Sequence, residues 1–162
     1  HWGTLFCPTG FESWQTAICR CKMTAGTCHR IAFQIVRFKN YASNSWNLVF
    51  GILPRTTFRH GNVVGFPNDG GYGVAYCNGK ILQNTSNCLF DNCFVEYKFQ
   101  VTDKIGMELD WKQAKAAPVF RLFANQSCIY QSSGNLDANE GIAAWYFGVS
   151  IYRFNAVQIV PW

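Results

Sequence analysis

Short apolar segments separated by polar turns run through most of the 162-residue chain. Several segments alternate between apolar and polar positions, and this period of two is typical of a strand with one buried face. The clearest case places Ile105, Met107, Leu109 and Trp111 on one side of a strand. The pattern predicts at least eight strands, and hence an all-β antiparallel sandwich. The expected strands cover 31–38, 46–52, 72–76, 94–101, 105–111, 120–123, 145–152 and 156–160.

Turn signals lie between these segments. The sequences at 69–71 (DGG) and 78–79 (NG) tolerate the positive φ angles of tight turns, and Asn125 begins another polar turn. Only 112–117 is expected to be briefly helical. No internal repeat, low-complexity tract or linker interrupts the pattern, so we expect one domain over residues 1–162.

The composition narrows the class of protein. The chain is 49% hydrophobic, 17% aromatic and 14% charged, which excludes intrinsic disorder because apolar burial offsets the conformational entropy lost on folding. Nine Asp and Glu residues are too few for a helix bundle. The chain lacks the run of about 18 apolar residues that a membrane-spanning helix needs. The net charge of +5 comes from scattered Lys and Arg, so we expect neither a nucleic acid nor a membrane as partner.

Three ordered motifs resemble the SPRY domain, the core of the B30.2 module. Residues 44–52 (NSWNLVFGI) resemble a strand of the family that ends in Val, Gly and a β-branched residue. Residues 71–80 (GYGVAYCNGK) resemble the family's strand and turn that begin with Trp-Gly and end with Gly-Lys. Residues 102–110 (TDKIGMELD) are similar to the family's motif of Asp, Ile-Gly and Leu-Asp. The match covers about 29–160, with 1–28 matched loosely. As in a divergent member, the chain departs from the pattern at Tyr72 (usually Trp), Gln126 (usually Gly) and Phe147 (usually Pro).

The resemblance implies a bent antiparallel β-sandwich of the SPRY or concanavalin-like jelly-roll type, with no catalytic centre. It implies a protein-interaction module that binds a peptide or partner-protein surface through loops at one edge of the sandwich. Such modules belong to larger adaptor, scaffold or ubiquitin-ligase-type proteins, so we expect a cytoplasmic protein whose isolated domain is monomeric. The edge positions carry Arg55, Phe58, Arg59, His60, Tyr152, Arg153 and Phe154.

Arginine and aromatic side chains, the types enriched at interface hot spots, dominate these edge positions. For 54–60 the alternative is an ordinary solvated loop, because such residues are common on surfaces. For Arg153 the alternative is a tight turn with Phe154 packed inward. Residues 23–27 are a weaker third part of the edge, by position alone.

A secreted, lectin-like carbohydrate-binding sandwich stabilised by disulfides is the alternative function. Exposed Trp side chains stack on sugar rings, and Trp2, Trp14 and Trp145 are the candidates. Glycosylation sequons begin at Asn84 and Asn125 and would suit an exported protein. The one loop with the acidic and amide side chains that calcium prefers contains Asp137, Asn139 and Glu140.

Metal binding and catalysis are not expected. Glu108 and Asp110 point to the same side of one strand, yet the resemblance gives Asp110 a structural role in a turn. We therefore expect no cofactor, no metal and no catalytic residue. The residues of zinc-binding type that lack the spacing of a zinc knuckle are Cys19, Cys21, Cys28 and His29.

Eight cysteines suit either a cytoplasmic or an exported protein. Free cysteine is a common buried residue and a domain of this length needs no disulfides, which favours eight reduced thiols, while four disulfides stay the alternative. Thiol counting under denaturing, non-reducing conditions checks this prediction. Four disulfides would contradict a cytoplasmic location and favour the lectin-like alternative. Cys88 and Cys93 would then be the first pair to test, because they bracket an expected loop.

Overall fold

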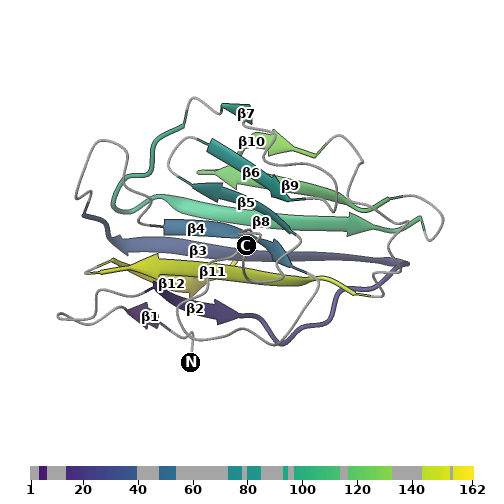
Figure 1. The fold of residues 1–162 in the computed structure, drawn as a ribbon, viewed down its shortest axis with the longest axis horizontal. Coiled ribbons are helices and arrows are strands. Elements are labelled where there is room, and N and C mark those ends of the chain that lie inside the picture. The colour runs from purple at the N-terminus through teal and green to yellow at the C-terminus, as the bar shows by residue number, and fades with distance from the viewer. Residues whose placement is uncertain are drawn as a thin grey trace.

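Two antiparallel β-sheets pack face to face (Figure 1) in a computed structural model that describes residues 4–6, 14–39, 48–53, 73–77, 80–84, 93–94, 97–113, 117–132, 144–153 and 155–162. Sheet A has the strand order β1 (Thr4–Phe6), β12 (Ala156–Val160), β3 (Thr27–Arg37), β8 (Lys104–Trp111), β9 (Val119–Ala124) and β10 (Ser127–Gln131). Sheet B has the order β2 (Trp14–Ile18), β11 (Tyr146–Tyr152), β4 (Leu48–Leu53), β5 (Gly73–Cys77), β6 (Lys80–Asn84) and β7 (Cys93–Phe94).

The all-β antiparallel sandwich predicted from the sequence is confirmed. Seven of the eight expected strands correspond to β3, β4, β5, β8, β9, β11 and β12. The described residues contain no helix, and therefore none long and apolar enough to cross a membrane. The sequence pattern did not reveal β1, β2, β6, β7 and β10, which are short strands of two to five residues.

A hydrophobic core fills the space between the sheets. Ile105, Met107 and Leu109 of β8 point into it, as their alternation predicts, and each is at most 1% exposed. The rings of Phe33 on β3 and Phe50 on β4 meet across the two sheets with centroids 5.7 Å apart. Burial of such side chains is the main stabilising contribution to a sandwich of this kind.

The alternation over 94–101 predicts one strand, but the described residues 97–101 of this range form none. Only β7 is paired in a sheet here, and 97–102 form an irregular segment that turns into β8. Phe99 still enters the core. The backbone N–H of Gln100 donates to the Asp103 carboxylate at 2.7 Å and closes a local turn. This side chain–backbone bond offers the chain an alternative to sheet pairing.

The short helix expected over 112–117 is not present in its described part. Lys112 and Gln113 follow β8 without helical structure. The backbone N–H of Lys112 instead donates to Oδ1 of Asp110 at 3.4 Å. Asp110 therefore supports a turn at the end of β8, as the resemblance implies.

Asp103, a buried acidic residue, ties the start of β8 to the end of β9. Its Oδ1 accepts a hydrogen bond from Nδ2 of Asn125 at 2.9 Å, and Oδ1 of Asn125 accepts one from the backbone N–H of Lys104 at 2.9 Å. Burial, together with the hydrogen bond and charge of Asp103, raises the pKa of Tyr97 to about 12. Because Nδ2 of Asn125 is engaged, attaching a glycan at this sequon would disturb the contacts that position β8.

The hairpin between β9 and β10 turns over two residues of positive φ, Asn125 (48°) and Gln126 (76°). Two-residue turns of this kind favour Asn-Gly, because glycine alone adopts positive φ without a steric penalty from Cβ. Asn125 suits its position. Gln126 stands where the SPRY pattern has glycine, so the hairpin contains one strained residue.

We predict that Gln126→Gly raises the free energy of unfolding by about 0.5–1 kcal/mol, because the relief of strain exceeds the added chain entropy of glycine. Chemical denaturation followed by tryptophan fluorescence measures the change. Ser127→Gly, one residue further on in β10, is the matched control and is expected to destabilise the domain. Equal destabilisation by the two substitutions would contradict the turn assigned here.

Candidate functional site

A row of polar side chains crosses the outer face of sheet A, the face turned away from the core. Arg30 on β3 lies opposite Glu108 on β8, which in turn lies opposite Arg121 on β9. Gln131 on β10 lies opposite Arg121 and extends the row. Opposed residues of an antiparallel sheet bring their side chains together, and the even-numbered positions of β8 face outward because its odd positions enter the core. We call these four residues the polar row.

Glu108 holds the polar row together. Its Oε2 accepts a hydrogen bond from Nε of Arg30 at 2.5 Å, and its Oε1 accepts one from Nη1 of Arg121 at 2.5 Å. Arg121 also donates through Nε to Oε1 of Gln131 at 2.8 Å and lies 3.6 Å from Oδ2 of Asp110. The side chain of Glu108 is only 5% exposed, so its charge depends on these bonds for compensation.

The electrostatics of the polar row are set by the central carboxylate. The pKa values of Arg30 and Arg121 are both raised, mainly by the hydrogen bond that each donates to Glu108. Coulomb attraction to the same carboxylate raises them further. Both guanidinium groups are therefore always charged. Since the side chain of Arg30 is 54% exposed and that of Arg121 27%, the row presents a fixed pattern of charge to solvent.

A pocket of about 300 Å³ lies beside the polar row on the same face. The neighbouring row of the sheet, formed by Ala32, Gly106 and Phe123, contributes apolar surface. Polar and charged side chains surround that surface. The remaining lining residues are Arg30, Lys104, Glu108, Gln126 and Trp162.

Trp162 is the exposed aromatic side chain of the pocket. Its ring meets Phe123 edge to face, with centroids 5.3 Å apart and planes at 85°, and the guanidinium carbon of Arg30 lies 5.4 Å from its centroid. A Cβ at Gly106 would lie 2.8 Å from two of its ring atoms, which is closer than atoms pack. Glycine at this position therefore lets the ring rest on β8, and the C-terminus indeed lies over the middle of the strands in Figure 1.

The outer face of sheet B differs from this open face. Val49 and Leu53 on β4 and Ser150 on β11 occupy outward positions, yet each is 0% exposed. The hydroxyl groups of Ser150 and Thr16 hydrogen-bond to each other at 2.7 Å. These outward positions of sheet B are therefore covered, whereas the outer face of sheet A carries the pocket and the polar row.

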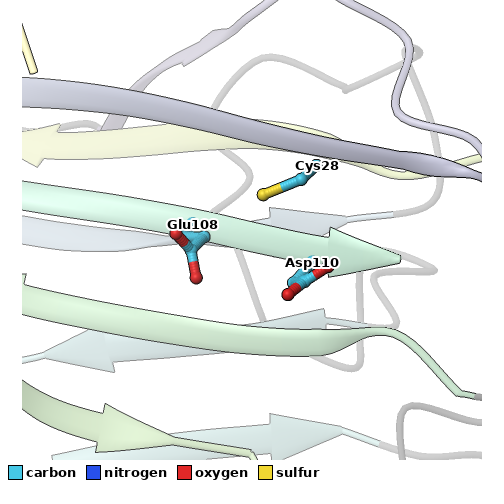
Figure 2. A group of neighbouring side chains, drawn as sticks. All are labelled: Cys28, Glu108 and Asp110. Atoms are coloured by element: carbon cyan, nitrogen blue, oxygen red, sulfur yellow. The ribbon is translucent and has the colours of Figure 1, made fainter. Parts of the chain in front are cut away.

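Figure 2 shows Glu108 and Asp110 on β8 with Cys28 of the adjacent β3 beside them. Their ligand-type atoms lie within 4.8 Å of one another, and no other such group of three or more occurs among the described residues. Both oxygens of Glu108, however, already accept hydrogen bonds from arginine. Two adjacent guanidinium groups would also repel a cation, so the donor set does not suit a metal ion.

The residues of zinc-binding type do not converge. Cys28 and His29 are neighbours in β3 and therefore point to opposite faces of sheet A. The thiol of Cys21 lies 3.6 Å from Nδ1 of His29, whereas Cys19 packs against the core. In the described part of the chain, Cys19, Cys21, Cys28 and Cys128 are free thiols.

The structure describes only part of the predicted edge. Tyr152 ends β11 and Arg153 begins the turn toward β12, with the guanidinium carbon of Arg153 5.2 Å from the Tyr152 ring centroid. Trp14 on β2 packs against Tyr152 with ring centroids 5.3 Å apart. The edge residues that lie outside the described part of the chain are Arg55, Phe58, Arg59, His60 and Phe154.

Of the tryptophans expected to stack on sugars, neither Trp14 nor Trp145 lines the pocket. Trp145 is 3% exposed and belongs to the core, so that expectation is wrong for it. Trp14 packs at the edge against Tyr152. Trp2 and the loop of Asp137, Asn139 and Glu140 lie outside the described residues.

The pocket and most of the polar row could not be predicted from the sequence. The alternation of β8 indicated that Glu108 faces outward, and this was the one available signal. Its partners Arg30 and Arg121 are 78 and 13 residues away in the chain, so their meeting depends on strand order. Trp162 follows the last strand and shows no pattern that would place it on β8.

Comparison with known proteins reveals relatives in fold alone. No protein-family model and no curated protein matches the sequence. The carbohydrate recognition domain of Emp46p in its metal-free form has a TM-score of 0.58 at 10% identity, covering 98% of this chain and 84% of that chain. Winged bean acidic lectin complexed with methyl-α-D-galactose has a TM-score of 0.59 at 12% identity, with coverage of 98% and 84%. The PSpry domain of TRIM65 has a TM-score of 0.54 at 14% identity, with coverage of 94% and 71%.

These neighbours place the chain in a recognised architecture. It has the two-sheet sandwich found in both SPRY and lectin domains, as the resemblance implies. At these identities the likeness shows the fold alone, and function depends on the residues of the site.

We predict that Glu108→Gln lowers the melting temperature by about 5 °C, because an NH2 donor then replaces one of the two oxygens that accept from Arg30 and Arg121, and the compensating negative charge is lost. Asp110→Asn is the matched control on the same strand and should lower the melting temperature by about 1 °C, since the ion pair of Asp110 with Arg121 is longer, at 3.6 Å, and partly exposed. Thermal unfolding followed by circular dichroism measures both changes. Equal melting temperatures for Glu108→Gln and the wild type would show that the polar row does not stabilise sheet A.

Proposed function

We propose that the domain is a non-catalytic protein-interaction module that binds a peptide or partner-protein surface at the edge where β11 turns toward β12. The observation that carries this proposal is the cluster of Trp14, Tyr152 and Arg153 at that edge. All three residues are partly exposed. Tryptophan, tyrosine and arginine are the residue types most enriched at interface hot spots.

The backbone beneath this edge cluster is firmly held. Asn155 is 0% exposed, and its Nδ2 donates to the carbonyl of Tyr152 at 2.5 Å while its Oδ1 accepts from the backbone N–H of Lys39 at 2.8 Å. These bonds stabilise a turn in which Arg153 has a φ of 43°, a region that few residues other than glycine adopt. A side chain presented on a fixed turn loses less conformational entropy on binding a partner.

Further observations support a binding role without catalysis. The carboxylates of Glu108 and Asp110, which a hydrolase could use as a pair, are engaged by Arg121 and by the turn at Lys112. The resemblance to SPRY domains and the similarity to the PSpry domain of TRIM65 favour a protein or peptide partner. We further propose that the domain is a monomeric unit within a larger cytoplasmic adaptor or scaffold protein, as the resemblance implies.

Carbohydrate recognition is the second candidate function, and one specific observation favours it. Trp162 presents an aromatic ring, 45% exposed, in a pocket that also contains charged and amide side chains. Neighbours in fold include the carbohydrate recognition domain of Emp46p and a winged bean lectin with a bound galactoside.

We predict that Arg153→Ala, Phe58→Ala and Arg59→Ala each weaken the binding of a partner peptide by about tenfold, because each removes a side chain of the type common at hot spots from the predicted edge. The peptide is obtained by phage-display selection against the wild-type domain, and its affinity is measured by fluorescence polarisation. Melting temperatures should stay within about 3 °C of the wild type, as is usual for surface changes.

Arg20→Ala is the control for this experiment, since Arg20 is an exposed arginine that follows β2. It should leave the peptide affinity unchanged. Loss of folding in the edge variants would show that these residues belong to the core. Unchanged peptide affinity in all three variants would overturn the edge as the binding surface.

A further inference from the structure

The pocket beside the polar row combines an apolar, partly aromatic surface with a polar surface that carries both donors and acceptors. Its apolar part consists of Ala32, Gly106, Phe123 and the Trp162 ring. Its polar part offers N–H donors from Arg30, Lys104 and Gln126, with carboxylate and amide oxygens as acceptors. Its volume of about 300 Å³ lies at the small end of the range for ligand pockets.

The aromatic ring of the pocket is held in place before any ligand binds. Trp162 contacts Phe123, Gly106 and the guanidinium of Arg30, on three different strands of sheet A. Even with these contacts it remains 45% exposed. A flat, fixed and exposed aromatic surface binds the C–H face of a ring at little entropic cost.

The polar groups distinguish between classes of ligand. A phosphate or a nucleic acid backbone needs donors and positive charge alone, whereas this pocket places the buried carboxylate of Glu108 among the donors. Each carboxylate oxygen has two acceptor positions, and the arginines occupy one on each oxygen. Hydroxyl groups both donate and accept, so a polyhydroxylated ring uses donors and acceptors side by side.

We propose that this pocket is a saccharide-binding site, in which one sugar ring lies against Trp162 and its hydroxyl groups bond to Arg30, Glu108 and Gln126. The proposal rests on the second candidate function, carbohydrate recognition, and is independent of the peptide-binding edge. Glu108 orients Arg30 for the ligand through their hydrogen bond, so the polar row acts as the scaffold of the site.

The test begins with the wild-type domain on an array of neutral and acidic glycans. The best-bound mono- or disaccharide is then titrated by isothermal calorimetry. Trp162→Ala should weaken its affinity by about tenfold or more, whereas Trp162→Phe, which keeps an aromatic face, should stay within about threefold of the wild type.

Gly106→Ala provides a second variant that changes no ligand-contacting polar group. The new Cβ displaces the Trp162 ring, so the affinity for the same saccharide should fall by about tenfold while the domain stays folded by circular dichroism. Arg30→Ala should also weaken binding. Arg20→Ala, an exposed arginine outside the pocket, is the matched control and should bind as the wild type does.

Each contrary outcome overturns a defined part of the inference. Saccharide binding that survives both Trp162→Ala and Gly106→Ala would overturn the pocket as the site and leave carbohydrate recognition standing. If the wild type binds no saccharide on the array or by calorimetry, both the pocket as a saccharide site and carbohydrate recognition as a function are overturned. Binding of polyanionic glycans alone, abolished by salt, would also overturn the proposal, because it would reflect net positive charge and not a built site.

Discussion

The central position of Glu108 between two arginines is the interaction on which the open face of sheet A depends. A nearly buried carboxylate is costly unless opposite charges and hydrogen bonds compensate it. Here Arg30 and Arg121 meet that need from the strands on either side, each at 2.5 Å. The same bonds fix the directions of both guanidinium groups, so the requirement for compensation also organises the surface beside the pocket.

The alternation of β8 connects this surface to the core. Ile105, Met107 and Leu109 pack between the sheets, while Gly106 and Glu108 occupy the intervening outward positions. A shift of register by one residue would bury Glu108 between the sheets and expose its apolar neighbours. Core packing therefore specifies the register that aligns the polar row, and changes to core residues of β8 would act on the pocket through that register.

Two separate surfaces of the sandwich offer chemistry for binding. The edge cluster of Trp14, Tyr152 and Arg153 comes from sheet B and the turn after β11. The pocket with Trp162 lies on the outer face of sheet A. The fold is similar to both SPRY and lectin structures, so architecture does not choose between the two surfaces. The choice depends on local side-chain chemistry, which makes substitutions at Arg153 and Trp162 directly informative.

The sequence by itself determined the fold class, most of the strands and the core side of β8, because alternation with a period of two is a local property of the chain. It also predicted a polar turn beginning at Asn125, where the structure has the turn between β9 and β10. Where side chain–backbone bonds compete with pairing, as between Gln100 and Asp103, the same local rule predicted a strand that does not form. Only the tertiary structure decided that Arg30 and Arg121 meet Glu108 and that Trp162 rests on Gly106. These contacts join residues far apart in the chain, and strand order and register, not local pattern, bring them together.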